Sequence, residues 1–271
     1  MEQGPPSTSE NQDRPGAPPQ PAWTDERLAE DPHRDAEKAD RVQRMFTAIA
    51  GSYDLNNRVH SLLLDQRWRR HAVKTAAVRT GDVVVDVACG TGDLTEAFAA
   101  TPAARVIGVD FTFAMLERAR RRQRSLAGAM SGKIAYVEGD AMRLPLADAC
   151  CDVVSIAFGL RNVQEPARAL AEFRRVLRPG GRLVILEFGR PRFPPVRWAN
   201  DLYTKVIMPR TATWISRDRS GAYKYLPRSI ETFLDRPTIL AMLGEAGFAE
   251  TGARSLSGGI CACYRAIANG E

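Results

Sequence analysis

The stretch Asp86-Val87-Ala88-Cys89-Gly90-Thr91-Gly92-Asp93 ends an apolar, β-branched run that begins at Val83. Apolar residues at helical spacing follow it over 93–100. Because glycine has no Cβ, a turn that contains Gly90 and Gly92 lets backbone N–H groups approach a ligand closely. The stretch therefore predicts a strand, a ligand-binding turn and a helix, with an ordinary tight turn as the alternative.

The spacing of these glycines argues against a phosphate site. Asp93 and Leu94 follow Gly92, so the pattern Gly-x-Gly-x-x-Gly is not completed, and the stretch lacks the Gly-Lys-Ser/Thr of a P-loop. We therefore do not expect the turn to cradle a phosphate.

The alternation of strand and helix patterns continues along the chain. Four more apolar runs follow, at 105–110, 134–138, 152–157 and 182–188. Helical patterns separate them, including one over 165–177, so we expect an α/β fold with a doubly wound, mostly parallel sheet that is covered on both faces. Residues 248–256 and 259–266, joined by Ser257-Gly258, predict a C-terminal hairpin. The sheet should therefore have seven strands and an antiparallel edge.

The composition indicates one main domain. The 271 residues include 38 Lys and Arg, 32 Asp and Glu, and 44% apolar residues, enough for one large core. No apolar run reaches the roughly eighteen residues that span a bilayer, and the start of the chain has no features of a secretory signal, so we expect a cytoplasmic protein. Five cysteines without Cys-x-x-Cys spacing predict neither a disulfide nor a metal site.

Charge is distributed unevenly. Residues 1–40 hold four basic and ten acidic residues and seven prolines, so we expect a disordered acidic tail before a domain over 41–271. That domain has 34 basic and 22 acidic residues, a formal charge of about +12. The excess indicates either an anionic partner, such as lipid, phosphate or nucleic acid, or only an arginine-rich, soluble surface.

Two helical stretches precede the first strand. The first begins near residue 41, has an apolar face and ends near Gly51. A loop is expected at 53–58, followed by a second helix from about Leu62 to Val78.

Acidic residues end the next two strands. Asp110 lies 18 residues beyond Gly92, where a carboxylate in doubly wound folds accepts hydrogen bonds from ribose hydroxyls. Asp140 ends the following strand, where a carboxylate can accept from the amine of adenine. The carboxyl ends of parallel strands share one edge, so the turn and both acids predict a site for an adenosine.

These features resemble the class I S-adenosylmethionine-dependent methyltransferases, in which Ala88 would stand where the first glycine often lies. A closer resemblance, over about 41–267, is to the quinone C-methyltransferases of menaquinone and ubiquinone biosynthesis. Five blocks carry it: Ser52-Tyr53-Asp54-Leu55-Asn56-Asn57, Gly90-Thr91-Gly92-Asp93-Leu94, Phe158-Gly159-Leu160-Arg161-Asn162-Val163, Arg178-Pro179-Gly180-Gly181 and Tyr223-Lys224-Tyr225-Leu226-Pro227-Arg228-Ser229-Ile230.

The resemblance implies S-adenosylmethionine as the cofactor. It places the methionine part near Thr91, the ribose at Asp110 and the adenine beside Asp140 and Ala141. Relatives often have serine where this chain has Ala157, which is therefore expected only to line the site. The full set of expected cofactor-binding residues is Asp86, Gly90, Thr91, Gly92, Asp110, Asp140, Ala141 and Ala157.

The implied reaction places demands on the acceptor side. A ring carbon of a reduced quinone becomes nucleophilic as a neighbouring hydroxyl loses its proton, so a base or a cation is needed there. Arg161 with Asn162 is the best-placed pair, because a guanidinium can stabilise a phenolate. The candidates for the proton acceptor are Tyr53, Asp54 and His60.

Each of these residues also has a purely structural interpretation. Arg161 could pair with a carboxylate such as Glu165, and Asn162 could cap the next helix. Asp54 could be an N-cap, and Tyr53 and His60 could be packing residues. The sequence leaves these alternatives open.

Residues 190–236 are the expected helical insertion on the acceptor side. They hold seven of the twenty aromatic residues, with ten basic against four acidic residues. This mixture predicts a seat for a quinol ring and its isoprenoid tail, and peripheral contact with an anionic membrane. Burial of the rings as core is the alternative. We take Arg58, Tyr223 and Tyr225 as the expected substrate contacts.

The resemblance therefore predicts C-methylation of demethylmenaquinol to menaquinol. Menaquinone is favoured because the arginine-rich and alanine-rich composition is typical of high-GC bacteria, many of which lack ubiquinone. The alternatives are a ubiquinone precursor, another small-molecule acceptor and, less favoured, a nicotinamide-dependent oxidoreductase. A nucleic-acid partner is not expected, and a homodimer is an alternative to a monomer.

Overall fold

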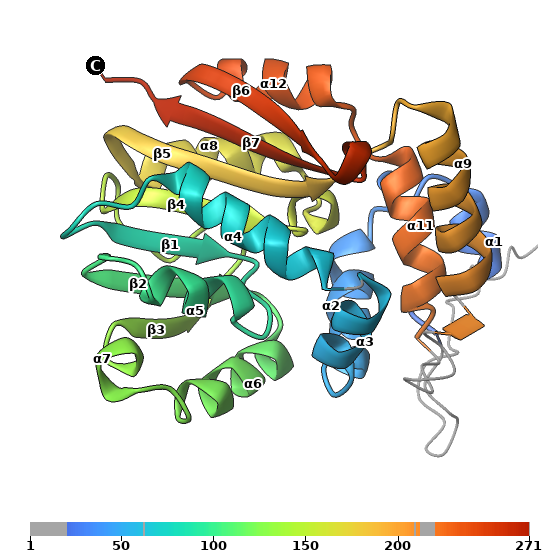
Figure 1. Cartoon of the computed structure of the whole chain (residues 1–271), viewed down its shortest axis with the longest axis horizontal. Helices are drawn as coiled ribbons and strands as arrows, with labels where there is room; N and C mark the ends of the chain where they lie inside the picture. Colours follow the sequence, from blue (N-terminus) through green and yellow to red (C-terminus); the bar gives the residue numbers. More distant parts are fainter. Residues whose placement is uncertain (1–20, 62, 209, 212–219, 271) are drawn as a thin grey trace, which may run out of the picture.

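A computed structural model describes residues 21–61, 63–208, 210–211 and 220–270. Its centre is a seven-stranded sheet in the order β3-β2-β1-β4-β5-β7-β6 (Figure 1). The strands are β1 (Val83–Val87), β2 (Arg105–Asp110), β3 (Ile134–Glu138), β4 (Cys151–Ala157), β5 (Leu177–Phe188), β6 (Phe248–Leu256) and β7 (Cys261–Ala268). The first five pair in parallel, and β7 runs antiparallel to both β5 and β6. The expected α/β fold, with its antiparallel C-terminal hairpin, is confirmed.

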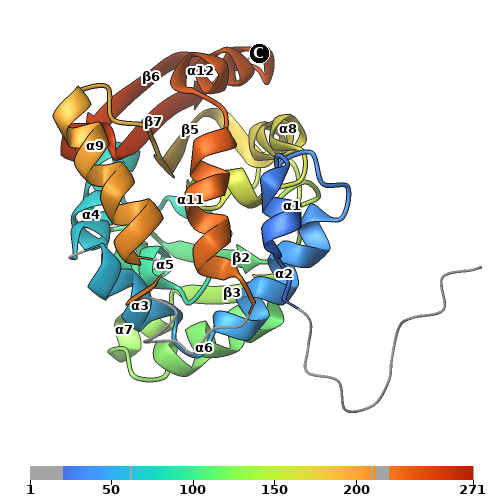
Figure 2. The same ribbon diagram turned by 90° about the vertical axis from the view of Figure 1, so that its right-hand side faces the viewer.

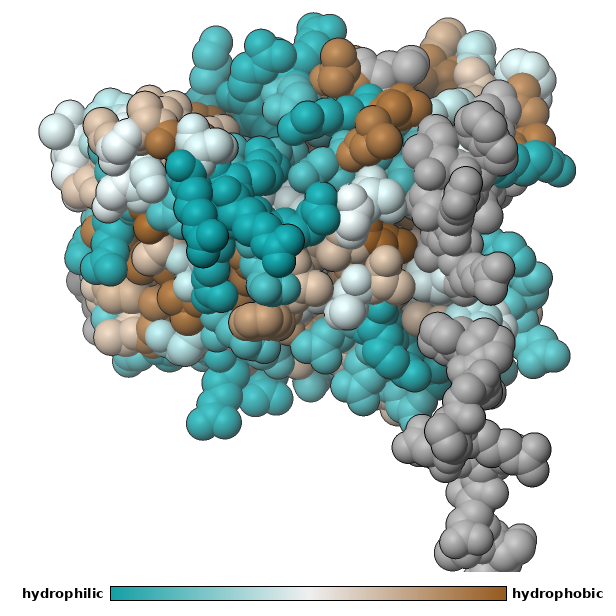
Figure 3. Space-filling model, turned by 90° about the horizontal axis from the view of Figure 1, so that it is seen from below, coloured by the Kyte–Doolittle hydropathy of each residue, from teal (hydrophilic) through white to brown (hydrophobic). Residues whose placement is uncertain are grey.

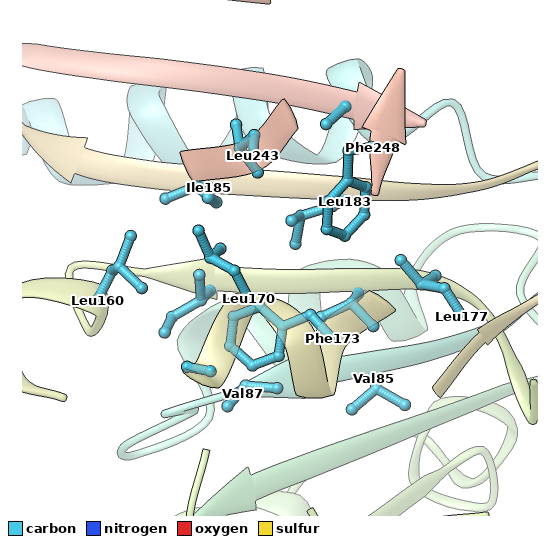
Figure 4. Packing of buried hydrophobic residues seen from close by; sticks show 14 of the residues in the cluster. Val85, Val87, Leu160, Leu170, Phe173, Leu177, Leu183, Ile185, Leu243 and Phe248 are labelled. Carbon is cyan, nitrogen blue, oxygen red and sulfur yellow. The ribbon is translucent and has the colours of Figure 1, made fainter. Parts of the chain in front are cut away.

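Helices cover both faces of the sheet. One face carries α4 (Leu64–Ala76), α5 (Asp93–Ala99) and α6 (Phe113–Gln123), with the short α7 (Gly128–Ser131) after them, and the other carries α8 (Pro166–Val176) and α12 (Arg236–Glu245). Because side chains alternate along a strand, Val84 packs toward α4 and α5, whereas Val85 and Val87 pack toward α8. Figure 4 shows the core on the side of α8, where Phe173 of that helix lies over Val87.

A further group of helices covers the carboxyl ends of the parallel strands (Figures 1 and 2). It consists of α1 (Asp25–Ala29), α2 (Lys38–Ile49), α3 (Tyr53–His60), α9 (Pro194–Leu202), the π-helical turn η2 (Tyr203–Ile207) and α11 (Ala222–Thr232). The buried apolar side chains of this group, which come mainly from α2, α11 and residues 22–28, form a separate apolar cluster. Among the helices of the described chain, none is both long and apolar enough to cross a membrane.

The N-terminal segment differs from the prediction. Residues 1–20 lie outside the described residues, but residues 21–40 are folded and include α1 and the start of α2. Trp23 and Lys38 are each only 1% exposed. The prediction of a disordered tail is therefore wrong for 21–40, because one large ring and many side-chain hydrogen bonds to other segments offset the scarcity of apolar residues.

The segment expected as a loop at 53–58 is helical and forms most of α3. Asp54 lies in its first turn, and Arg58 and His60 lie in its last turn; the charges of Asp54 and Arg58 complement the helix dipole. Leu62, the expected start of the next helix, lies outside the described residues, and α4 begins at Leu64.

Lys38 fastens the N-terminal segment to the chain that follows β4. Its ammonium donates a hydrogen bond to the carbonyl of Val163 at 2.5 Å. Burial lowers the pKa of Lys38 from 10.5 to about 8, and the nearby Asp31 opposes this shift only in part. The folded protein therefore holds a lysine charge at a cost in stability.

Replacing Lys38 with methionine tests this cost. At pH 7 both the folded and the unfolded wild type carry the charge, but between about pH 8 and 10.5 the folded chain releases the proton first. The unfolded chain then binds more protons, so the contribution of Lys38 to stability rises with pH. The wild type should gain about 2–3 kcal/mol relative to Lys38→Met between pH 7 and pH 10. Urea unfolding at both pH values measures this gain, and a difference that does not change with pH would contradict it.

Candidate active site

A hydrogen bond joins the turn after β1 to the end of β2. The N–H of Gly90 donates to Asp110 Oδ2 at 2.8 Å, and the N–H of Thr112 donates to Oδ1 at 2.8 Å. Gly90 has a φ of +57°, which residues with a Cβ rarely adopt. Burial raises the pKa of Asp110, and the two N–H donors oppose this shift. The carboxylate is thus fixed in place, with a lone pair left on each oxygen for another donor.

A cavity of about 90 Å³ opens beside this turn. Asp140, at the end of β3, also faces it, and the N–H of Met142 holds its Oδ1 at 2.9 Å. Five of the expected cofactor residues line this cavity: Gly90, Asp110, Asp140, Ala141 and Ala157. The structure therefore brings the glycine turn and both strand-end acids to one hollow.

The other three expected cofactor residues, Asp86, Thr91 and Gly92, support the turn from outside this cavity. Asp86 accepts hydrogen bonds from the hydroxyls of Thr95 and Ser155, both at 2.7 Å, and burial raises its pKa to about 6. Thr91 donates its hydroxyl to Asp54 at 2.5 Å. A Cβ at Gly92 would collide with the hydroxyl of Tyr136.

A larger cavity, of about 1300 Å³, lies between the carboxyl edge of the sheet and the group of helices that covers this edge, which we call the helical cover. Three aromatic residues line both cavities: Phe46, Tyr53 and Phe158. The two cavities therefore meet at these rings. Four other expected site residues line the larger cavity: His60, Arg161, Tyr223 and Tyr225.

Like Asp86, Thr91 and Gly92, the expected residues Asp54 and Arg58 lie outside both cavities. Asp54, besides its bond to Thr91, lies 3.5 Å from the guanidinium of Arg122. Arg58 faces Asp93 at 3.9 Å, and Arg122 pairs with the same carboxylate at 2.7 Å. This network holds α3 against the glycine turn. Arg122 was not predicted as part of the site, because it is one of five arginines in residues 118–124, and such a run is typical of a solvated helix face.

Arg161 is held by a buried carboxylate. It lies in the 3₁₀ turn η1 (Leu160–Asn162) after β4, and its guanidinium pairs with Glu187 at 2.8 Å. Glu187, at the end of β5, is fully buried and also accepts the backbone N–H of Arg161. The ring of Phe188 lies 5.1 Å from the guanidinium carbon. The alternative pairing with Glu165 is therefore wrong, because Glu165 lies against Arg168 instead.

Asn162 connects the two cavities to α11. Its amide Nδ2 donates to the carbonyl of Phe158 at 3.3 Å, and its Oδ1 accepts from the hydroxyl of Tyr225 at 3.0 Å. The carbonyl of Phe158 also accepts from Arg161 at 2.6 Å. Asn162 does not cap α8, whose N-cap is Glu165, so that alternative is wrong.

His60 lines the larger cavity and is held there by Tyr203. The hydroxyl of Tyr203 donates to the carbonyl of His60 at 2.9 Å, so the 3.2 Å contact between that hydroxyl and Nδ1 fits an Nδ1–H donor. Nε2 is then the unprotonated nitrogen, and it is buried without a hydrogen-bond partner among the described residues. Burial also lowers the pKa of His60, which favours the neutral ring.

Sequence reasoning missed several residues of this region. Phe111 and Met142 line the smaller cavity directly after Asp110 and Ala141, and this adjacency was a usable signal. Glu187 was also detectable, as a charge at the end of an apolar strand. Tyr203 gave no signal, since its contact with His60 spans 143 positions of the sequence.

The sheet order, the antiparallel β7 and the cavity at the first glycine turn define a class I methyltransferase. Two solved structures share the fold. One is a possible histamine N-methyltransferase from Thermotoga maritima, with a TM-score of 0.58 and 20% identity, covering 83% of this chain and 99% of that one. The other is a putative methyltransferase from Haloferax volcanii, with a TM-score of 0.59 and 17% identity, covering 83% and 98%.

Residues 34–268 match the ubiE/COQ5 methyltransferase family. A demethylmenaquinone methyltransferase from Clavibacter sepedonicus is 41% identical over 232 residues, 86% of this chain and 92% of the relative. The ubiquinone/menaquinone biosynthesis C-methyltransferase UbiE of Cronobacter sakazakii is 38% identical, over 84% and 91%. The chain belongs to this family, is a C-methyltransferase and has S-adenosylmethionine as its cofactor.

The contact between Gly92 and Tyr136 gives a test of the turn. Gly92→Ala should destabilise the protein by about 1–3 kcal/mol, because the new methyl group collides with the Tyr136 hydroxyl. Removing that hydroxyl with Tyr136→Phe should recover part of the loss in the double variant. Urea unfolding measures both.

Gly90→Ala is the matched control for this test, because a Cβ at Gly90 meets open space and only the positive φ is strained. Its cost should be the same with Tyr136 or Phe at position 136. An equal loss for Gly92→Ala in the two backgrounds would show that the collision does not occur.

Proposed function

We propose that this protein transfers the methyl group of S-adenosylmethionine to a ring carbon of demethylmenaquinol, forming menaquinol. The main structural support is the wall of Phe46, Tyr53 and Phe158 that the smaller cavity shares with the larger one. The names of the relatives support a quinone acceptor. A ubiquinone precursor or another small molecule is the alternative acceptor, and nicotinamide-dependent oxidoreduction is less favoured.

The smaller cavity is the proposed site of the nucleoside. The free lone pairs of Asp110 suit ribose hydroxyls, and the carboxylate of Asp140 suits the amine of adenine. When bound, S-adenosylmethionine supplies an electrophilic methyl group. Ligand pockets usually measure at least about 300 Å³, so Phe46 and α2, which cover this cavity of about 90 Å³, should shift outward on binding.

The larger cavity is the proposed site of the quinol. The charge of Arg161 lowers the pKa of a neighbouring hydroxyl and stabilises the phenolate that activates the ring carbon. Glu187 keeps this guanidinium in place. Asn162 is the proposed partner of Arg161 at the junction of the two cavities, and the rings of Tyr223 and Tyr225 are the proposed walls around the quinol.

Among the three candidate proton acceptors, His60 is favoured. Burial raises the pKa of Tyr53, so that phenol stays protonated at neutral pH. The carboxylate of Asp54 already accepts a hydrogen bond from the hydroxyl of Thr91, and Asp54 lies outside the cavities. His60 has a lowered pKa and a buried Nε2 without a partner among the described residues, so it is ready to accept a proton. Activity that depends on it should fall as the pH drops through its pKa.

An assay with S-adenosylmethionine and demethylmenaquinol tests the function. The wild type should yield a product one methyl group heavier, detected by mass spectrometry. Glu187→Gln removes the charge that holds Arg161, and kcat should fall on the order of 10²-fold. Glu165→Gln, the same change at an exposed position beside Arg168, is the control and should retain the wild-type kcat. Methylation of a benzoquinol or an unrelated acceptor, but not of demethylmenaquinol, would overturn the proposal.

We also propose that α9 contacts an anionic membrane on its cytoplasmic face. Trp198 and Leu202 of α9 and Val206 of the adjoining η2 follow a four-residue spacing that places them on one side, and they are 70%, 42% and 41% exposed. Figure 3 shows hydrophobic side chains at the surface on the side of the helical layer, at its right. Arg192 and Arg197 line the larger cavity together with other residues of α9, and both are exposed, so their charges suit anionic headgroups beside that cavity.

Vesicle sedimentation tests the membrane proposal. The wild type should bind phosphatidylglycerol vesicles at low salt more strongly than phosphatidylcholine vesicles, and Trp198→Ser should weaken that binding several-fold. Phe113→Ser is the control, because Phe113 is also exposed but lies on α6, outside the helical cover. Absence of wild-type binding, or equal losses in the two variants, would refute it. The homodimer stays a prediction, which analytical ultracentrifugation tests.

A further inference from the structure

The N-terminal strap, residues 21–39, lies across the acceptor side of the molecule. Figure 2 shows its helix α1 beside α11, and the two helices are in contact. Residues 21–33 of the strap precede the part of the chain that matches the family. This first part of the strap, which includes α1, is therefore a feature that the family match does not explain.

Trp23 is the buried anchor of the strap. Its ring stacks on Tyr225 of α11 with centroids 4.6 Å apart and an interplanar angle of 19°. The backbone N–H of Trp23 donates to the carbonyl of Ser220 at 3.1 Å. Gly221 permits this approach, since its φ is +83° and a Cβ there would collide with the Trp23 carbonyl.

Further polar contacts hold the strap along its length. Arg228 Nε donates to the carbonyl of Leu28 at 3.1 Å, and a ring nitrogen of His33 lies 2.9 Å from the carbonyl of Ser229. At the other end, the amide of Gln164 donates to the carbonyl of Asp35 at 2.9 Å. The strap thus joins α11 to the segment just after Arg161 and Asn162.

Tyr225 connects the strap to the candidate active site. It is 1% exposed, lines the larger cavity and donates its hydroxyl to Asn162 Oδ1 at 3.0 Å. Asn162 in turn donates to the carbonyl of Phe158, which also binds the guanidinium of Arg161. One face of the Tyr225 ring is covered by Trp23, so the stack fixes the plane of the ring and with it the direction of the hydroxyl.

We propose that Trp23 is a positioning residue for methyl transfer, because its stacking orients Tyr225 and thereby Asn162 at the junction of the two cavities. The kinetic part rests on the proposed function. A misplacement of site groups by about 1 Å can cost up to about 10²-fold in rate, so a loosened Tyr225 should be visible in turnover even when the fold persists.

Kinetics of Trp23→Ala in the full-length protein test this role. The variant should lower kcat/KM for demethylmenaquinol about tenfold and leave the KM for S-adenosylmethionine unchanged. Trp23→Phe, which keeps a stacked ring, should restore most of the loss. In a Tyr225→Phe background, which lacks the hydroxyl, Trp23→Ala should cause little further loss of kcat/KM, because both changes break the connection from Trp23 through Tyr225 to Asn162. Additive losses would overturn the proposal.

Leu28→Ala is the matched control, because Leu28 is a buried apolar residue of the strap outside this stack. Both alanine variants should lower Tm, but only Trp23→Ala should lower kcat/KM. Losses of kcat/KM that follow Tm equally in the two variants would mean that Trp23 only supports the fold.

A second measurement is independent of the acceptor. With ¹⁵N-asparagine labelling, the side-chain amide signal of Asn162, assigned through Asn162→Asp, should shift in Trp23→Ala but not in Leu28→Ala. An unmoved signal would overturn the positioning role even if the wild type methylates demethylmenaquinol. If the signal shifts but the wild type fails to methylate that quinol, the proposed function fails while the positioning of Asn162 stands.

Discussion

The hydrogen bond between the Gly90 N–H and Asp110 is the constraint on which the site depends. It locks the end of β2 to the turn after β1, so the Asp110 carboxylate and the backbone of the glycine turn face the same small cavity. Only a residue that tolerates positive φ can present its N–H in this way. The remaining wall, from Asp140 to Ala157, follows from parallel strands that all end at one edge.

A second constraint acts on the acceptor side, where helices from distant parts of the sequence are tied together by polar contacts. Thr91 and Arg122 hold α3 to the glycine turn through Asp54 and Asp93. The contact between Tyr203 and His60 joins η2 to α3. The larger cavity is therefore bounded by elements that the sheet alone does not position.

Most of the sheet and the cofactor side could be predicted from the sequence, because strand periodicity and strand-end acids are local patterns. The acceptor side was less predictable. The partner of Arg161 is Glu187, 26 positions away, and the helix at 53–58 was taken for a loop because its polar residues mask the helical period. The order of residues 21–40 depends on Trp23 meeting Tyr225, a contact that composition cannot reveal.

The buried Arg161–Glu187 pair limits how this enzyme can diverge. Loss of either residue alone strands a charge in the interior, a penalty of about 3–5 kcal/mol that would consume much of a typical margin of stability. Substitutions at these two positions can therefore be tolerated only when both residues change together. Evolution toward an acceptor with a different ring should instead change uncharged residues of the cavity wall, such as Tyr223. A substitution there leaves no buried charge without its partner.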